Sequence, residues 1–176
     1  ALAVRFHSNN NGMIRDVNIV GKGAIGLDLS SGHNGPLLVK DVRIDGFAIG
    51  LRAGSGPFNS QTVDGLVLRH QRQWGIYNDR EALTLRNVDF EGACPFFYAF
   101  GNNTLIDATA KGIDAKGPAI TAIDRFYCRN LKLSGYEQGI KVGRSYRDKR
   151  KKLKFKFEDE LKAAGEIREW YMNPHS

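Results

Sequence analysis

The stretch Ile14-Arg15-Asp16-Val17-Asn18-Ile19-Val20-Gly21 decides the fold, because its pattern returns at Val39-Lys40-Asp41-Val42-Arg43-Ile44-Asp45-Gly46. The pattern is apolar, basic or polar, Asp or Asn, apolar, any residue, apolar, any residue, glycine. Four further copies, with some departures, begin at Val63, Leu85, Leu105 and Cys128. The third position falls at residues 16, 41, 65, 87, 107 and 130, so successive copies lie 25, 24, 22, 20 and 23 residues apart. Six copies at so steady a period indicate a solenoid.

A second apolar element follows most copies after a short gap. It is seen most clearly in Ile25-Gly26-Leu27-Asp28-Leu29, Ile49-Gly50-Leu51-Arg52-Ala53 and Trp74-Gly75-Ile76-Tyr77-Asn78. These short pieces are rich in β-branched residues and bounded by Gly, Asn and Pro, which is typical of strands. No segment before Asp159 shows the sustained helical period that a leucine-rich repeat would need. We therefore predict an all-β fold, a right-handed single-stranded parallel β-helix of about six coils over residues 1–143.

The alternation of side chains predicts a corner at the third position of each copy. Val17 and Ile19 face inward, and Ile14 can share that side only if the chain bends at Asp16. Asp or Asn occupies the corner in five of the six copies. Both residues tolerate left-handed backbone dihedrals and bond their own turn, so we expect a tight turn between two strands at each corner.

Stacked coils also predict columns of outward side chains. The third strands give a column of Asp28, Arg52, Tyr77, a residue near Tyr98, Thr121 and Lys141. After the corner, Asp45, Arg69, Glu91 and Lys111 alternate in sign, which we interpret as an exposed charge ladder. Before the corner, Arg15, Lys40, Arg86 and Arg129 form a basic stripe, which is either solvated surface or a holder of acidic sugar.

Two strands meeting at an Asx corner, followed by a third strand and a loop, resemble the pectate lyase superfamily. The likeness is nearest to glycoside hydrolase family 28-related bacterial proteins, and it covers roughly residues 4–143. It is carried by Ser8-Asn9-Asn10-Asn11-Gly12-Met13-Ile14-Arg15-Asp16-Val17, by Gly26-Leu27-Asp28-Leu29 and by Asn59-Ser60-Gln61-Thr62. The resemblance implies a polysaccharide partner and a secreted or periplasmic, bacterial-like location.

In that superfamily the substrate groove runs along the third strand and its flanking loops, which places the candidate site here. The resemblance implies catalytic candidates Asp28, Arg52, Asp79 and Glu81, and substrate-binding candidates His70, Arg72, Trp74, Tyr77 and Arg80. Two carboxylates about 5–10 Å apart suit glycoside hydrolysis. Lysis would use an Arg or Lys base beside a uronate, often with Ca²⁺. The sequence shows no tight acidic cluster for Ca²⁺, so we predict no metal site and no cofactor.

Polygalacturonases of this superfamily carry Asn-Thr-Asp, Asp-Asp, Gly-His-Gly and Arg-Ile-Lys in that order. This chain has only Ser31-Gly32-His33-Asn34-Gly35 and Gly139-Ile140-Lys141, and neither matches in full. The hydrolase site is therefore not carried over. Three functions stay open: a polysaccharide hydrolase or lyase, or a fragment of one; a non-catalytic glycan-binding module; and a structural solenoid. The resemblance favours the first.

The formal net charge of +7 is concentrated near the C-terminus, because residues 144–176 carry 10 Lys and Arg against 6 Asp and Glu. There Leu153–Phe157 alternates like a strand, and Asp159–Trp170 predicts a short amphipathic helix with Leu161, Ala164, Ile167 and Trp170 on one face. We interpret residues 144–176 as a basic extension that caps the open coil end. A basic patch for nucleic acid or for an anionic surface is the disfavoured alternative, since the basic run lacks aromatics at base-stacking intervals and matches no nucleic-acid module.

Two further expectations concern the surroundings of the chain. No apolar run approaches the roughly 18 residues of a membrane span, so we predict no membrane association. The chain opens directly on the strand-like stretch Ala1–Phe6 without an initiator Met. We interpret this as a trimmed or processed segment, in which a missing N-terminal segment or a partner chain caps the first coil.

Overall fold

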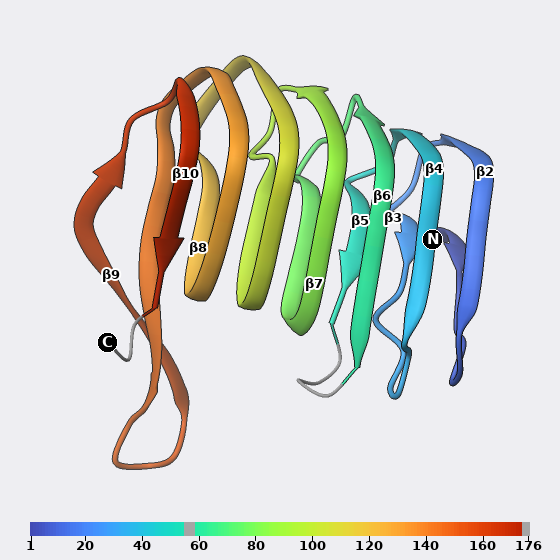
Figure 1. Cartoon of the computed structure of the whole chain (residues 1–176), viewed down its shortest axis with the longest axis horizontal. Helices are drawn as coiled ribbons and strands as arrows, with labels where there is room; N and C mark the ends of the chain where they lie inside the picture. The colour runs from blue at the N-terminus through green and yellow to red at the C-terminus, as the bar shows by residue number, and fades with distance from the viewer. Residues whose placement is uncertain (55–58, 174–176) are drawn as a thin grey trace.

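The computed structural model describes residues 1–54 and 59–173 of the chain, and in these residues it is built of strands without a helix (Figure 1). The strands are β1 (Leu2–Arg5), β2 (Gly12–Gly21), β3 (Ile25–Asp28), β4 (Leu37–Gly46), β5 (Ile49–Ala53), β6 (Ser60–Arg69), β7 (Trp74–Gly92), β8 (Phe97–Arg147), β9 (Leu153–Lys162) and β10 (Glu166–Met172). They wind into a parallel-strand solenoid of about five turns, against about six predicted coils. The all-β parallel solenoid is confirmed, and its right-handed winding stays a prediction.

The coils stack in the register that the repeat predicts. One parallel sheet side runs β2–β4–β6–β7–β8 and aligns Arg15, Lys40, Asp64, Arg86 and Ile106. The other runs β1–β3–β5–β7–β8 and aligns Asp28, Arg52, Tyr77 and Tyr98. Because equivalent repeat positions pair directly, the predicted columns are physical columns along the solenoid axis as far as Tyr98, Ile106 and Lys111, where the printed strand pairings end.

The Asx corners are left-handed, as predicted. Backbone φ is positive at all six third positions, namely Asp16 (55°), Asp41 (51°), Gly65 (78°), Asn87 (53°), Asp107 (55°) and Asn130 (52°). Neighbouring corners are also linked, because Asn130 Nδ2 donates to Asp107 Oδ1 at 2.8 Å. Asp and Asn are the side-chain-bearing residues that adopt this conformation most readily, which explains why they recur there.

The interior is a single apolar core that runs through the coils. Its largest fully buried side chains include Phe90, Phe96, Phe97 and Phe126. The glycine in each Gly-apolar element is required because no room remains for a side chain. At Gly75, for example, a Cβ would lie 2.7 Å from both Phe90 Cδ2 and the carbonyl oxygen of Phe96. The glycines of the Gly-apolar signature therefore mark where the third strand lies too close to core side chains and neighbouring backbone for a Cβ.

The C-terminal segment departs from the prediction. The strand at Leu153–Phe157 is confirmed as part of β9, which pairs antiparallel with Ile140–Arg147 to form a hairpin. The helix predicted over Asp159–Trp170 is wrong, because β9 continues to Lys162 and β10 begins at Glu166. Gly165 between them has φ of +140°, which no α-helix accommodates.

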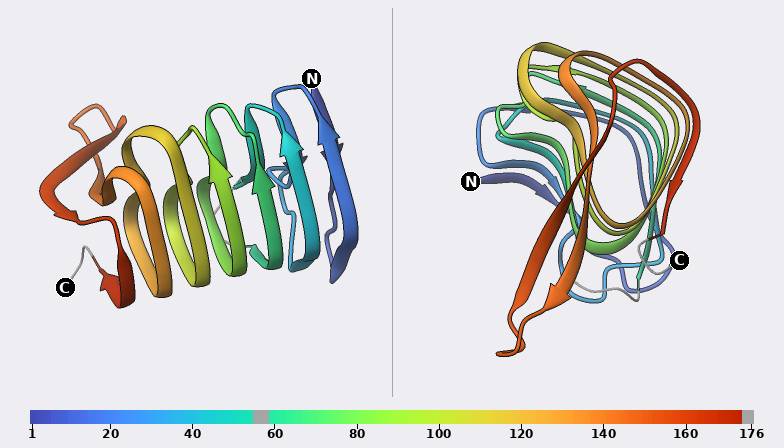
Figure 2. Two further views of the ribbon diagram at one scale, coloured as in Figure 1. Left: turned by 90° about the horizontal axis from the view of Figure 1, so that it is seen from above. Right: turned by 90° about the vertical axis from the view of Figure 1, so that its left-hand side faces the viewer.

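Pairing with a non-local partner explains why the segment 159–170 forms strands instead of the predicted helix. β10 runs antiparallel to the Phe126–Lys132 part of β8, with Ile167 opposite Leu131 and Trp170 opposite Cys128. Strand pairing there satisfies the backbone N–H and C=O groups of β10, and it overrides the helical spacing of the apolar residues, while the capping of the open coil end stays a prediction. Figure 2 shows the β8–β9 hairpin projecting away from the coils.

Candidate functional site

Three aromatic side chains gather on the outward face of the third strands, and we call Trp74, Tyr77 and Tyr98 the aromatic cluster. Tyr77 and Tyr98 are register partners in β7 and β8, and their rings stack at 4.7 Å with 7° between their planes. Trp74 lies edge-on to Tyr98 at 5.4 Å and to Tyr77 at 6.3 Å. All three side chains are partly exposed. The cluster therefore offers an apolar surface that spans two coils and remains accessible from solvent.

Charged groups flank this cluster along the strand and along the column. Arg52 is the register partner of Tyr77, one coil away. Asp79 lies two residues after Tyr77 and is 43% exposed at its side chain. Burial raises the pKa of Tyr98 to about 12, and the neighbouring Tyr77 and Asp79 add to the effect. The cluster thus combines an aromatic surface with one cation and one accessible carboxylate.

Asp28 lies in the same column, but its carboxylate is already bound by neighbouring side chains. Its side chain is 2% exposed, and it accepts from Ser30 Oγ at 2.6 Å and from Arg5 Nη2 at 3.2 Å. Burial alone would raise the pKa of Asp28, but these hydrogen bonds and the nearby Arg52 outweigh it and lower the pKa. Asp28 is therefore an enclosed carboxylate, poorly suited to donate a proton to a polymer.

Glu81 has the opposite electrostatic character. It is fully buried, and its Oε1 accepts from the backbone N–H of Ala82 at 3.0 Å. Its Oε2 has no partner among the described residues. Burial raises the pKa of Glu81 to about 7, although backbone hydrogen bonds partly oppose the rise. Glu81 is thus a carboxyl poised near neutrality, like many catalytic acids, but enclosed by the fold.

The surroundings of Glu81 are polar and just as enclosed. Asn78 donates to the carbonyl of Glu81 at 3.0 Å and to Asn103 Oδ1 at 2.8 Å. Within the described chain, Asn103 Nδ2 and Gln61 Oε1 also lack partners. This buried polar corner follows the third strand at a register shift between Asp79 and Ala82. Sequence reasoning singled out Glu81 but missed the amides around it, because their side chains meet only when the coils stack.

The remaining predicted residues are held in turns. His70 Nδ1 lies 2.8 Å from Asp45 Oδ1, and that hydrogen bond is the largest cause of the lowered pKa of Asp45. Arg72 Nη2 donates to the carbonyl of Gly23 at 2.9 Å. Arg80 Nε pairs with Asp79 at 3.1 Å, and its guanidinium lies 6.0 Å from the Phe100 ring. His70 and Arg72 precede the third strand while Arg80 follows it, so the three do not converge on one point.

The structure thus brings together part of the predicted set. Trp74, Tyr77, Arg52 and Asp79 share the third-strand face. Asp28 and Asp79 are two coils apart, about 10 Å along the axis before their offset along the strand is added. With Asp28 and Glu81 both buried, the predicted residues provide no pair of exposed carboxylates facing each other.

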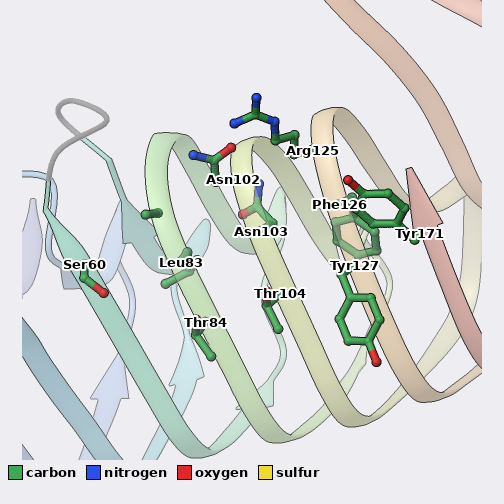
Figure 3. Close-up of a pocket in the computed structure, with 11 residues that line it drawn as sticks. Ser60, Leu83, Thr84, Asn102, Asn103, Thr104, Arg125, Phe126, Tyr127 and Tyr171 are labelled. Atoms are coloured by element: carbon green, nitrogen blue, oxygen red, sulfur yellow. The ribbon is translucent and has the colours of Figure 1, made fainter. Parts of the chain in front are cut away.

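A hollow of about 280 Å³ lies on the other sheet side, among residues that sequence reasoning had not named as a candidate site (Figure 3). Thr84, Thr104 and Tyr127 lie on neighbouring coils in its floor, and Asn102 and Arg125 lie at one rim. Tyr171 joins from β10, opposite Tyr127 in register. The threonine column was visible in the repeat, but Tyr171 reaches the hollow only through the unforeseen strand pairing.

No group of three or more His, Cys, Asp or Glu side chains in the described ranges could hold a metal ion. In the same ranges no helix is long and apolar enough to cross a membrane. Comparison with protein-family models, curated proteins and solved structures found no match to this chain.

Proposed function

We propose that this chain is an extracellular glycan-binding solenoid, which holds an acidic polysaccharide along the outward face of its third strands. The aromatic cluster carries the proposal. Trp74, Tyr77 and Tyr98 keep apolar ring surface in contact with water although the core nearby buries four phenylalanines. Exposed aromatic surface beside charged groups is a common feature of binding sites, and it suits the C–H-bearing face of a sugar ring.

The column geometry also suits a polymer. Equivalent positions repeat at roughly 4.8 Å along the axis, so a chain laid along the column meets a new side chain at each coil. Arg52 comes directly before Tyr77 in this column, and an arginine fork matches the carboxylate of a uronate. A sugar stacked on Tyr77 could thus place an acidic group at Arg52.

Binding rather than cleavage is favoured by the state of the carboxylates. Asp28 is enclosed by Ser30 and Arg5, and Glu81 is fully buried. Asp79 is accessible, but it has no second exposed carboxylate within the predicted set to complete an acid–base pair. Glycoside hydrolysis requires two such groups on either side of the scissile bond.

Intrinsic fluorescence offers a direct test, because Trp74 and Trp170 are the only tryptophans. In a Trp170→Phe background, titration with polygalacturonate should change the Trp74 emission, and Tyr77→Ala with Tyr98→Ala should weaken binding by about tenfold. Tyr171→Ala, an exposed tyrosine on β10, is the matched control and should bind normally. No binding to polygalacturonate, alginate or neutral glycans would contradict the proposal and leave the structural solenoid.

One observation favours a second candidate, a polysaccharide hydrolase or lyase. The raised pKa of Glu81, about 7, is the property expected of a general acid. A screen for reducing ends and unsaturated products over acidic and neutral glycans tests it, with Glu81→Gln and Asp79→Asn as variants. Turnover that disappears in Glu81→Gln, with the fold intact by circular dichroism, would replace the binding proposal by the catalytic one. Absence of turnover would exclude catalysis on the glycans screened.

A further inference from the structure

The β8–β9 hairpin carries the densest charge in the molecule, and we call Arg144–Lys156 the cationic arm. This segment holds eight Lys and Arg residues and one Asp. The arm projects beyond the coils (Figures 1 and 2), and each of the eight cationic residues is exposed. A projecting, highly basic hairpin presents its charge to a partner more than to the rest of the fold.

The carboxylates of Asp148 and Glu158, which lie in the described part of the arm and just after it, already have partners. Asp148 Oδ1 accepts the backbone N–H groups of Arg150 at 2.9 Å and of Lys152 at 2.8 Å, so it holds the turn together. Glu158 pairs with Arg144 at 2.7 Å. Among the described side chains, the lysines of the arm have no carboxylate within ion-pair distance: Lys149, Lys151, Lys152, Lys154 and Lys156. Their positive charge is therefore left for an external anion.

The strand register determines which side chains lie on each face of the arm. Arg144 lies opposite Lys156 and Tyr146 opposite Lys154, so these side chains share one face. Ser145 lies opposite Phe155 on the other face, where the Phe155 ring lies edge-on to Phe100 at 5.2 Å. Arg144 on this face pairs with Glu158, whereas Lys154 and Lys156 lie two residues apart on β9 without a carboxylate partner among the described side chains. These two like charges repel each other, and a bound polyanion would remove that repulsion.

We infer that the cationic arm binds the acidic groups of the same polysaccharide, an inference that rests on the proposed function. Continuity with the third-strand face supports this occupant. Lys141 belongs to the predicted column that contains Tyr77 and Tyr98, and its Nζ lies 4.6 Å from the ring of Phe157 at the base of the hairpin. A polysaccharide bound along the column would therefore reach the arm.

The composition of the arm favours an acidic glycan over a nucleic acid. Tyr146 is the one aromatic on the charged face, whereas single-stranded nucleic acid needs a series of rings on which successive bases stack. Five of the eight cations are lysines, which act as point charges. Such point charges suit regularly spaced carboxylate or sulfate groups, whereas nucleic-acid recognition more often uses the planar fork of arginine.

Charge removal at the tip tests the inference without touching the aromatic cluster. The arm variant replaces Lys149, Arg150, Lys151 and Lys152 with Gln. The matched control replaces Lys22, Arg43, Lys116 and Lys132 with Gln, which changes the net charge equally at exposed positions of the coils outside the basic stripe and the third-strand column. Binding of polygalacturonate and of its fully methyl-esterified form is measured at low and high salt.

We expect the arm variant to lose about tenfold or more in affinity for polygalacturonate at low salt, and to lose much of the salt dependence. It should keep the wild-type affinity for the esterified chain, and the control should keep most of its affinity for both. Equal losses in arm variant and control, or wild-type binding by the arm variant, would overturn the inference. So would a loss confined to a single-stranded oligonucleotide measured in parallel.

The two proposals fail in different ways. If substitution of Tyr77 and Tyr98 leaves all glycan binding unchanged while the arm variant loses polygalacturonate, the proposed third-strand site is wrong and the arm alone binds. If the aromatic variant loses both forms and the arm variant loses neither, the third-strand site stands and the arm inference is wrong. The tip residues are exposed, and an unchanged melting temperature of the arm variant confirms that its fold is intact.

Discussion

The solenoid and the cationic arm use β-strands in opposite ways. In the solenoid, parallel strands surround a core in which Phe90, Phe96 and Phe97 have no exposed surface. In the arm, two antiparallel strands leave Leu153 and Phe155 each 38% exposed. The solenoid sequence is thus constrained by packing at nearly every second residue. Packing constrains the arm sequence far less, so most of its residues can serve binding.

The largest expected contrast comes from the same substitution in the two regions. Phe90→Ala should lower the free energy of unfolding by about 3–5 kcal/mol, because it opens a cavity against Phe96 and Gly75. Phe155→Ala should cost about 1 kcal/mol, since its ring is already partly in water. Urea unfolding followed by circular dichroism measures both. Similar losses for the two variants would show that the arm is part of the same cooperative core.

The second contrast concerns a buried carboxyl and an exposed one. The folded pKa of Glu81, about 7, exceeds its ordinary 4.5, so the unfolded chain releases this proton first. Stability is therefore lost as pH rises from about 4.5 to 7, by about 3 kcal/mol in total. Glu81→Gln should remove that loss and be more stable than the wild type at pH 8, with little difference at pH 4.

Asp79→Asn removes an exposed carboxyl two residues away and serves as the control for this measurement. It should keep the wild-type difference in unfolding free energy between pH 4 and pH 8. If Glu81→Gln keeps that difference as well, Glu81 is not the group that couples stability to pH. The pH series then has to be repeated on variants of other buried groups.

A third prediction compares left-handed residues in the two regions. Asn87 has φ of 53° and donates to Asp64 Oδ1 at 2.6 Å, whereas Lys151 in the arm has φ of 59° within the tip turn. Asn87→Ala should cost about 1–2 kcal/mol, because Ala tolerates this conformation poorly and loses the hydrogen bond. Asn87→Gly should cost less, and Lys151→Gly should be neutral or slightly stabilising. Thermal melts rank the three, and an equal cost for Asn87→Ala and Asn87→Gly would remove the conformational explanation.

The sequence predicted the features that repeat and missed those that depend on a single long-range contact. The repeat pattern recurs from coil to coil, so it predicted both the corners, such as Asp16 and Asn87, and the column through Arg52 and Tyr77. The C-terminal helix was predicted from apolar spacing alone. Its error has a physical reason, because the decisive partner of β10 is a strand about 40 residues earlier in the chain.

The candidate site was predictable to a similar extent. Alternation showed that Asp28 points away from the aliphatic core, but not that Ser30 and Arg5 enclose it. The position of Glu81 near the third strand was clear from the sequence. Its burial arises from a register shift between Asp79 and Ala82, which the repeat pattern does not predict. Sequence patterns thus gave the column of each side chain but not its solvent exposure, on which the choice between binding and catalysis depends.

The smallest expected effect tests the alternating charge column after the corner. The structure confirms its register, with Asp45, Arg69, Glu91 and Lys111 in line, but Arg69 pairs with Asp89 instead of Glu91. Lys111 Nζ lies 3.5 Å from Glu91 Oε2, and both side chains are well exposed. A double-mutant cycle of Glu91→Gln and Lys111→Gln should give a coupling of about 0.5 kcal/mol or less that disappears in high salt. A coupling well above 1 kcal/mol would mean that charge pairs, and not only the apolar core, hold the coils in register; the five lysines of the arm, which have no such pair among the described side chains, would then differ from the solenoid in stability as well as in function.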